Sequence, residues 1–307
     1  MNFIKKWYTY QKERFPVLMF GIYILSIVIA VFSFGNFNNN ETINYTTIVP
    51  MFLVAFLQFL MVRIVDEFKD YEEDCKYRSY RPVPRGLITL HELKVLFIIC
   101  VILQFTITIL YGNGIISIIL LGIMWLYFVI MSEGFFIKSF LDKHILIEVW
   151  LDEIMMPIMI AFLLTFTPYM NDNASIFMIL PNANVPVYMS LSNAKYLLAM
   201  SYIVSCIVEV ARKIRAKEQE EKGVKTYTAV FGIPKAILLL TTLEAILSIT
   251  QYLILRNMLL PIMFCIPVII INILFVVYKN KQFAKGVELL ANIFIMLVYL
   301  SMFMLIV

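Results

Sequence analysis

The stretch "RIVDEFKDYEEDCKYRSYRPVPRG", residues 63–86, places six acidic and six basic residues in one short window, directly after an apolar run. The whole chain is 62% hydrophobic and only 15% charged, with a mean hydropathy of +0.86. Soluble domains carry about 45–50% apolar and about 25% charged residues. The composition therefore predicts an integral membrane protein, in which so dense a group of charges needs a specific explanation.

Apolar runs long enough to cross a bilayer recur along the chain. A transmembrane helix needs about 20 predominantly apolar residues, and packed membrane helices tolerate Pro and Gly. The first run lacks a small-residue cleavage site, so we interpret it as a span and not as a cleaved signal. We predict an all-α membrane protein with a single domain, 1–307, built as one bundle of nine spans. The predicted spans are 15–34, 48–65, 92–111, 114–132, 145–167, 194–211, 233–255, 258–278 and 287–306.

Lysine and arginine are distributed very unequally between the segments that connect these spans. Counted alternately from the N-terminus, five segments carry twenty of them, whereas the other four carry only Arg256. Short cytoplasmic loops are enriched in Lys and Arg. The pattern predicts a cytoplasmic N-terminus, cytoplasmic loops at about 66–91 and 209–232, and a C-terminus on the opposite side of the membrane.

The residue types restrict what the chain can bind. It has only two His and four scattered Cys, which argues against a zinc site or a disulfide framework. A metal would have to be held by carboxylates, which favours a hard cation such as Mg²⁺. The net charge of +4 lies in short loops between spans, where it favours contact with anionic membrane lipid and makes nucleic acid a poor partner.

Asp66, Asp70 and Asp74 recur at every fourth residue of the charged window. On a helix that continues from the second span they form one acidic stripe, with Glu67 on the adjoining face. Carboxylates at this spacing repel each other unless something neutralises them. Nearby lysines could do so in part, and a divalent cation would also leave positions open for phosphate oxygens. The alternative is a solvated, salt-bridged helix end.

The run "RPVPRG" then breaks the helix and presents Arg81 and Arg85 as ligands for a diphosphate. Arg63, one turn before the stripe, is predicted to orient it. The window resembles the first signature of the UbiA superfamily of intramembrane prenyltransferases, which includes membrane terpene cyclases. Its four acidic positions fall on Asp66, Glu67, Asp70 and Asp74, with Glu67 in place of the usual Asp. The resemblance implies a nine-helix bundle, bound Mg²⁺ and a prenyl diphosphate substrate.

A second charged stretch, "EVARKIRAKEQEEKGVKTYTAVFG" at 209–232, resembles the second signature of that superfamily less closely. Its tail of Gly223, Lys225, Thr226 and Gly232 fits, but the usual aspartates are absent. Glu209 and Glu220 are eleven residues apart, which would return them to nearly the same helical face. We assign Glu209 and Glu220 to the metal site.

Further charged residues are predicted to bind the substrates. The diphosphate contacts are expected from Arg212, Arg215, Lys225 and Lys138, with ordinary positive-inside charge as the alternative. Ionisable groups inside a span are usually functional. Glu148 and Asp152 lie one turn apart in the fifth predicted span. With Arg63 they are predicted to line a pocket for an acceptor or a carbocation; a structural hydrogen bond between helices is the alternative.

Together these features predict Mg²⁺-dependent transfer of a prenyl group from a prenyl diphosphate to an aromatic or lipid-like acceptor within the membrane. Loss of the diphosphate would leave an allylic cation, which the acceptor captures. The first alternative is a membrane terpene cyclase, because the second signature is poor in carboxylates and the resemblance allows cyclisation. The second alternative, from another class, is a transporter or a non-catalytic membrane protein.

Overall fold

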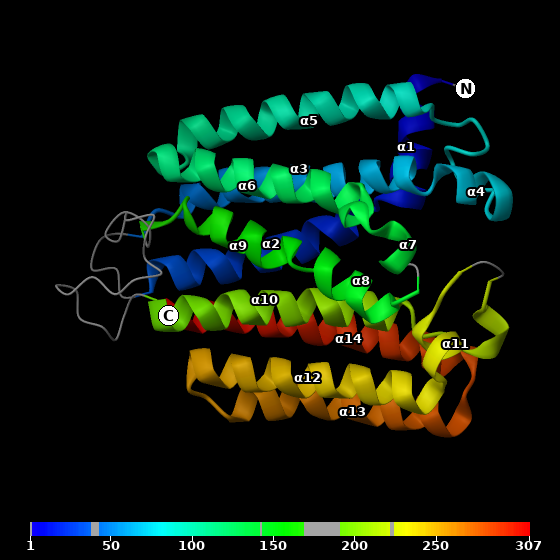
Figure 1. Ribbon diagram of the computed structural model, residues 1–307. Coiled ribbons are helices and arrows are strands. Elements are labelled where there is room, and N and C mark those ends of the chain that lie inside the picture. The colour runs from blue at the N-terminus through cyan, green and yellow to red at the C-terminus, as the bar shows by residue number, and fades with distance from the viewer. Residues whose placement is uncertain (1, 38–42, 142, 169–190, 222–223) are drawn as a thin grey trace. The chain divides into compact units, whose positions relative to one another are not determined.

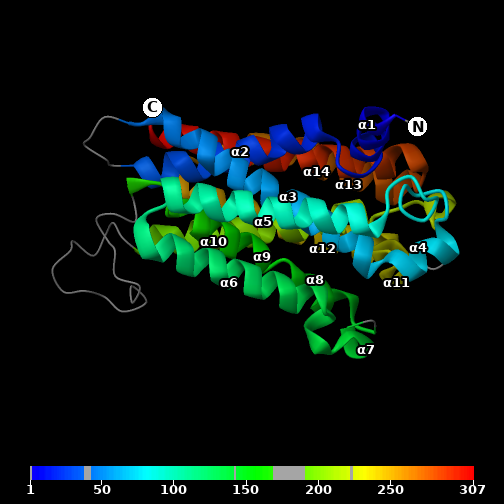
Figure 2. The same ribbon diagram turned by 90° about the horizontal axis from the view of Figure 1, so that it is seen from above.

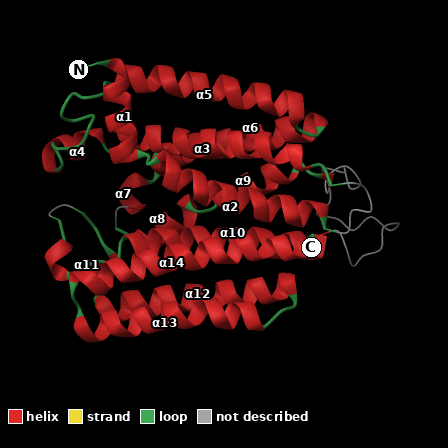
Figure 3. Cartoon of the chain, turned by 180° about the vertical axis from the view of Figure 1, so that it is seen from behind, coloured by secondary structure: helices red, strands yellow, loops and turns green. Residues whose placement is uncertain are grey.

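The computed structural model describes residues 2–37, 43–141, 143–168, 191–221 and 224–307. Within these ranges the chain forms helices and no strands (Figure 3). Eight of the described helical segments are long and apolar enough to cross a membrane. The predicted all-α, multi-pass membrane fold is confirmed. Contacts divide the chain into two compact units, Met1–Phe140 with Phe162–Asp172 and Leu141–Ala161 with Asn173–Val307, and the assignment of one domain stays a prediction.

The first unit holds four spanning helices and a short helix, α1, that runs across their ends (Figures 1 and 2). Its elements are α1 (Phe3–Arg14), α2 (Val17–Asn36), η1 (Tyr45–Thr47), α3 (Ile48–Lys69), α4 (Tyr71–Tyr77), α5 (Leu90–Tyr111), α6 (Gly114–Ser132), η2 (Gly134–Phe136) and α7 (Lys138–Leu141), which ends at the boundary between the units. Pro16 separates α1 from α2, because its fixed φ and missing N–H suit the start of a new helix. A capping box between Thr89 and Glu92 begins α5.

The second unit holds the other four spanning helices, and α10 packs against α12 and α14. Its elements are α8 (Ile145–Asp152), the first part of α9 (Met155–Leu164), α10 (Leu191–Arg212), η4 (Lys217–Gln219), α11 (Tyr227–Phe231), α12 (Ile233–Leu255), α13 (Leu259–Tyr278), α14 (Lys281–Ser301) and η5 (Met302–Leu305). In Figure 1, α12 and α13 lie side by side as a hairpin. Short turns at Arg256 and Lys279 join α12 to α13 and α13 to α14.

The fifth predicted span, 145–167, is helical but divided into α8 and α9. Pro157 lacks the N–H that would bond the Glu153 carbonyl, and the chain turns at residues 153–154. The Glu153 carbonyl instead accepts from the Met156 N–H at 3.2 Å and from the Ser205 hydroxyl at 3.4 Å. This break explains why the described chain has eight uninterrupted spanning helices where the hydropathy predicts nine segments.

Buried amide side chains tie spans together within each unit. In the first unit, Gln104 of α5 donates to the Val54 carbonyl of α3 at 3.0 Å and accepts from the Trp125 indole of α6 at 2.7 Å. In the second unit, Asn272 of α13 donates to Glu244 of α12 at 2.8 Å. Such interhelical bonds stabilise membrane helix pairs because hydrocarbon offers no other partner.

Candidate active site

The acidic stripe lies where α3 leaves the membrane span. The backbone N–H of Asp70 donates to the Asp66 carbonyl at 3.0 Å, and the N–H of Asp74 donates to the Asp70 carbonyl at 2.8 Å. Asp70 itself, at φ −94° and ψ 0°, separates α3 from α4. The helical spacing of the three aspartates therefore continues through a slight bend, as the sequence predicts.

Arginines neutralise the two buried carboxylates of this turn. Glu67 accepts from Arg14 Nε at 2.5 Å and lies 3.3 Å from Arg63 Nη2. Asp74 lies 2.8 Å from Arg78 Nη1 and 2.6 Å from Arg81 Nη1. Among the described residues the ion-pair partners of Glu67 and Asp74 are arginines, and neither Lys69 nor Lys76 is one of them. Glu67 and Asp74 are therefore engaged in ion pairs within the chain.

Asp66 and Asp70 are more open to solvent than Glu67 and Asp74. The Asp66 side chain is 42% exposed and lies 3.4 Å from Arg63 Nη1. Asp70 is half-buried and forms no ion pair with any described residue. Across the described parts of the chain no three His, Cys, Asp or Glu side chains gather into a metal-holding group. Mg²⁺ commonly binds through one or two carboxylates, with water and substrate phosphates completing its shell, so this oxygen-donor pair suits it.

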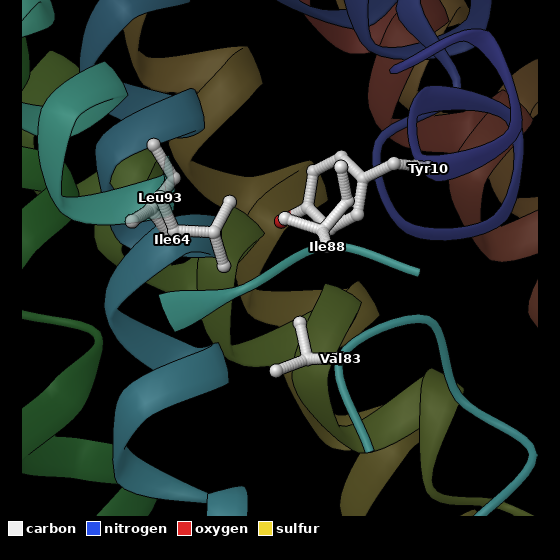
Figure 4. Close-up of a cluster of buried hydrophobic side chains, with 5 residues drawn as sticks. All are labelled: Tyr10, Ile64, Val83, Ile88 and Leu93. Carbon is white, nitrogen blue, oxygen red and sulfur yellow. The ribbon is translucent and has the colours of Figure 1, made fainter. Parts of the chain in front are cut away.

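A cluster of buried apolar side chains holds the loop that follows. Its members are Tyr10 of α1, Ile64 of α3, Leu93 of α5 and the loop residues Val83 and Ile88 (Figure 4). Val83 lies within the "RPVPRG" run and Ile88 two residues after its end, so burying both fixes the loop against three helices.

The two loop arginines predicted to bind diphosphate are placed by this turn. The Arg85 N–H donates to the Arg81 carbonyl at 3.0 Å, and Gly86 has φ +75°, a conformation that suits glycine. Arg81 pairs with Asp74, as described above. Arg85, about one-third exposed, lies 2.8 Å from the Glu13 carboxylate and donates to the Tyr80 carbonyl. The Arg81 guanidinium therefore lies at the acidic turn, whereas the Arg85 guanidinium is held by a carboxylate of α1.

The second charged stretch folds differently from its prediction. Helix α10 ends at Arg212, so Glu209 and Glu220 do not lie on one helix, and the prediction that they share a helical face is wrong. Glu209 pairs with Arg212 and, at 2.6 Å, with Lys213 Nζ, the two cations at its own helix end. The physical reason is that the chain turns after Lys213, whose carbonyl accepts from the Tyr227 N–H at 3.2 Å.

Glu220 is the centre of a hydrogen-bonded turn. Its carboxylate accepts from the Thr226 hydroxyl at 2.7 Å and from the Thr228 hydroxyl at 3.0 Å. Thr228 in turn accepts from the Arg215 N–H at 3.0 Å. These bonds join Arg215, Glu220, Thr226 and Thr228, so Glu220 has a structural role in addition to any ligand role.

Three other predicted residues have simpler placements. The Arg215 guanidinium donates to the Gln219 carbonyl at 3.2 Å and lies 3.5 Å from Glu221. Lys225 is exposed, and Lys138 is the first residue of α7. Gly223, part of the predicted tail, lies outside the described residues.

A buried tyrosine that the sequence did not single out lies close to several acids of the second unit. Tyr227 is fully buried, and its hydroxyl has no hydrogen-bond partner among the described residues. Burial raises the pKa of the Tyr227 phenol above its ordinary value, and the nearby carboxylates of Glu209, Glu153 and Glu148 raise it further. Asp152 interacts electrostatically with Glu153. The structure therefore brings Glu148 and Glu209 close to one phenol, whereas their spacing in the sequence is 61 residues.

Sequence reasoning also missed Arg14 at the first loop. It counted Arg14 only as one of the positive charges that set the topology. The available signal was its position directly before Phe15 and Pro16, at the membrane boundary where a first span begins. Its partner, Glu67, lies 53 residues further on, so no local pattern could identify the pair.

Comparisons with known proteins agree with this architecture. The sequence matches the UbiA prenyltransferase family over residues 24–297, while no curated protein matches it. A solved structure of digeranylgeranylglyceryl phosphate synthase is similar, with 19% identity, a TM-score of 0.62 and 98% of both chains covered. A UbiA homologue from Aeropyrum pernix K1, solved in its apo form, is similar with 11% identity and a TM-score of 0.65, over 90% of this chain and 95% of that one.

At these identities the structural likeness shows the fold alone. A UbiA homologue from Archaeoglobus fulgidus, solved with GPP and Mg²⁺, aligns with 12% identity over 93% of this chain and 98% of its own, but its TM-score of 0.47 is too low for an inference. The family match is different in kind, because it covers most of the sequence directly. The chain belongs to the UbiA prenyltransferase family.

Proposed function

We propose that this protein transfers a prenyl group from a prenyl diphosphate to an aromatic or lipid-like acceptor within the membrane. The observation that carries the proposal is the turn between α3 and α4. There Asp66 and Asp70 lie one helical turn apart with solvent-accessible carboxylates, beside arginines and at the end of a spanning helix. An anionic head group at the membrane surface and an apolar tail among the helices match this combination of charge and hydropathy.

Asp66, whose side chain is 42% exposed beside Arg63, and Asp70 would hold Mg²⁺. Glu67, Asp74 and Glu209 are less available because they are largely buried in ion pairs, and Glu220 because two threonine hydroxyls bind it. When bound, Mg²⁺ would supply Lewis-acid stabilisation of the departing diphosphate. Arg81 and Arg85 would add positive charge from the loop. The C–O bond of the substrate breaks with its electron pair leaving on diphosphate, and the acceptor forms the new bond and releases a proton.

The remaining assignments extend the same proposal. Arg212, Arg215, Lys225 and Lys138 are proposed as further diphosphate contacts, and Arg63, Glu148 and Asp152 as the lining of the acceptor or cation pocket. The N-terminus and both charged loops are proposed to face the cytoplasm, with the C-terminus on the opposite side. The support for this orientation is the alternation of Lys and Arg between connecting segments.

Labelled prenyl diphosphates of C10 to C20 chain length, given to the purified protein with and without a membrane lipid extract, test the proposal. We expect Mg²⁺-dependent release of diphosphate together with a prenylated product that needs the extract. Asp66→Asn and Asp70→Asn should each lower turnover about 100-fold or more, because charge stabilisation of the leaving group is lost. Glu72→Gln, an exposed acid on α4, is the matched control and should retain full turnover.

The outcomes separate the alternatives. A cyclic hydrocarbon or alcohol formed without any acceptor would replace the transferase by a terpene cyclase. Absence of Mg²⁺-dependent turnover with every chain length, together with unchanged behaviour of the Asp66 and Asp70 variants, would overturn the enzymatic proposal.

A further inference from the structure

Glu67 and Arg14 form a buried ion pair between segments far apart in the sequence. The Glu67 side chain is 0% exposed and the Arg14 side chain 10%, and Nε and Oε1 are 2.5 Å apart. Glu67 Oε2 and Arg14 Nη2 are both buried without another hydrogen-bond partner in the described chain. These are the atoms that the second bond of a side-on arginine–carboxylate pair would join, so each side chain keeps one buried group that the other could satisfy.

This pair is one of several contacts that fasten α1 across the ends of the spans. At the other end of α1, Lys6 Nζ lies 2.6 Å from Glu92 in the first turn of α5. Between them, Tyr10 packs into the cluster that holds the "RPVPRG" loop. The helix α1 therefore connects the start of α5, the loop and the last turn of α3, where Asp66 lies.

Glu67 also controls where a second arginine goes. Arg63 lies between the two acids, with Nη2 3.3 Å from Glu67 and Nη1 3.4 Å from Asp66. The Glu67 carboxylate draws Arg63 and Arg14 toward the buried side of α3. Without that charge, we expect the Arg63 guanidinium to turn fully to Asp66, its other carboxylate partner, and to compete there with a cation.

We propose that Glu67 is a positioning residue and not a ligand of the metal or the diphosphate. It binds Arg14 and Arg63, fixes α1 against the acidic turn, and limits the positive charge that reaches the exposed Asp66. The inference rests on the proposed function of that turn. It also gives a reason for Glu at this position, since its additional methylene extends the carboxylate toward α1.

The test measures Mn²⁺ affinity of the purified full chain by electron paramagnetic resonance, with Mn²⁺ as the probe for the Mg²⁺ site. Glu67→Gln and Arg14→Met should each weaken Mn²⁺ binding about 10-fold, the size typical of residues that orient metal ligands. The double variant should be no weaker than the worse single variant, because both remove the same pair. Thermal unfolding in the same detergent should show the same lack of additivity.

The direction of the Arg14→Met effect decides between the two roles. If Glu67 were a ligand, removing the positive charge of Arg14 would leave Mn²⁺ binding unchanged or make it tighter. Lys12→Met removes the same charge from an exposed position of α1, and it should leave the affinity within about twofold. Arg14→Lys keeps the positive charge but loses the two-donor geometry of the guanidinium group. Its Mn²⁺ affinity should therefore lie between those of the parent and Arg14→Met.

Suppose that Glu67→Gln weakens Mn²⁺ binding while Arg14→Met leaves it unchanged or makes it tighter. That result would overturn this inference and leave the proposed function intact. If instead the parent protein binds no Mn²⁺ and its turnover is unchanged by Asp66→Asn and Asp70→Asn, the proposed function is wrong. This inference then fails with it.

Discussion

The two charged loops of this protein hold their acids in different ways. In the first, arginines from α1, α3 and the loop pair with the buried Glu67 and Asp74 and leave Asp66 and Asp70 accessible. In the second, Glu209 pairs with cations at its own helix end, and threonine hydroxyls bind Glu220. The comparison shows that similar charge density gives different ion pairing, because long-range packing decides which carboxylates are buried. Three predictions test this difference, in order of decreasing effect.

Neutralising one bonded acid in each loop should give the largest contrast. Asp74→Asn leaves Arg78 and Arg81 without the carboxylate that they share, and should lower the free energy of unfolding by about 3–5 kcal/mol. Glu220→Gln keeps an oxygen that can accept from Thr226 and Thr228, so it should lose only about 1 kcal/mol. Denaturant unfolding in one detergent measures both, and equal losses would show that the loops are stabilised alike.

The glycines that end the two loops should respond alike. Gly86 has φ +75° and Gly232 φ +80°, and a Cβ at either would meet no heavy atom within 4 Å. Gly86→Ala and Gly232→Ala should therefore each destabilise by about 1–3 kcal/mol through backbone strain alone. Gly122→Ala, in the interior of α6 with equally open space, is the control and should be neutral or slightly stabilising in the same unfolding assay. A loss at only one loop would contradict the shared backbone geometry.

A buried tyrosine packs beside each loop. Removing its hydroxyl should change the stability less than the two preceding sets of substitutions. Tyr10 and Tyr227 have no hydroxyl partner among the described residues, and burial raises the pKa of both phenols. Folding thus favours the neutral phenol. The contribution of each neutral phenol to the free energy of unfolding is fully present below the unfolded pKa of about 10. It is lost as the pH rises above that value.

Tyr10→Phe and Tyr227→Phe should change neutral-pH stability by less than about 1 kcal/mol, because no hydrogen bond is removed. Above about pH 10 both variants should lose less stability than the parent, whereas Tyr8→Phe, at an exposed position of α1, should follow the parent. Unfolding measured from pH 8 to pH 12 checks the sign. A parent curve that all three variants reproduce would show that neither phenol titrates on unfolding.

Much of this protein could be predicted from the sequence, because the relevant physics is local. The hydrocarbon core of a membrane imposes a length and an apolar composition on each span, so hydropathy located the spanning helices without knowledge of their packing. The same holds for the acidic stripe, since the helical repeat alone sets the spacing of Asp66, Asp70 and Asp74. The weak point was the interval after Arg212, where a charge pattern gave no sign that α10 had ended.

The tertiary structure decided which of these charges are available. Arg14 reaches Glu67 across 53 residues, and the Thr226 and Thr228 hydroxyls bind Glu220, for which the sequence predicted only a metal role. An ion pair or a buried hydroxyl depends on which surfaces meet, and that depends on the packing of every helix around it. Residue type and spacing therefore located the candidate site, but only the packed helices separated its exposed carboxylates from those buried in ion pairs.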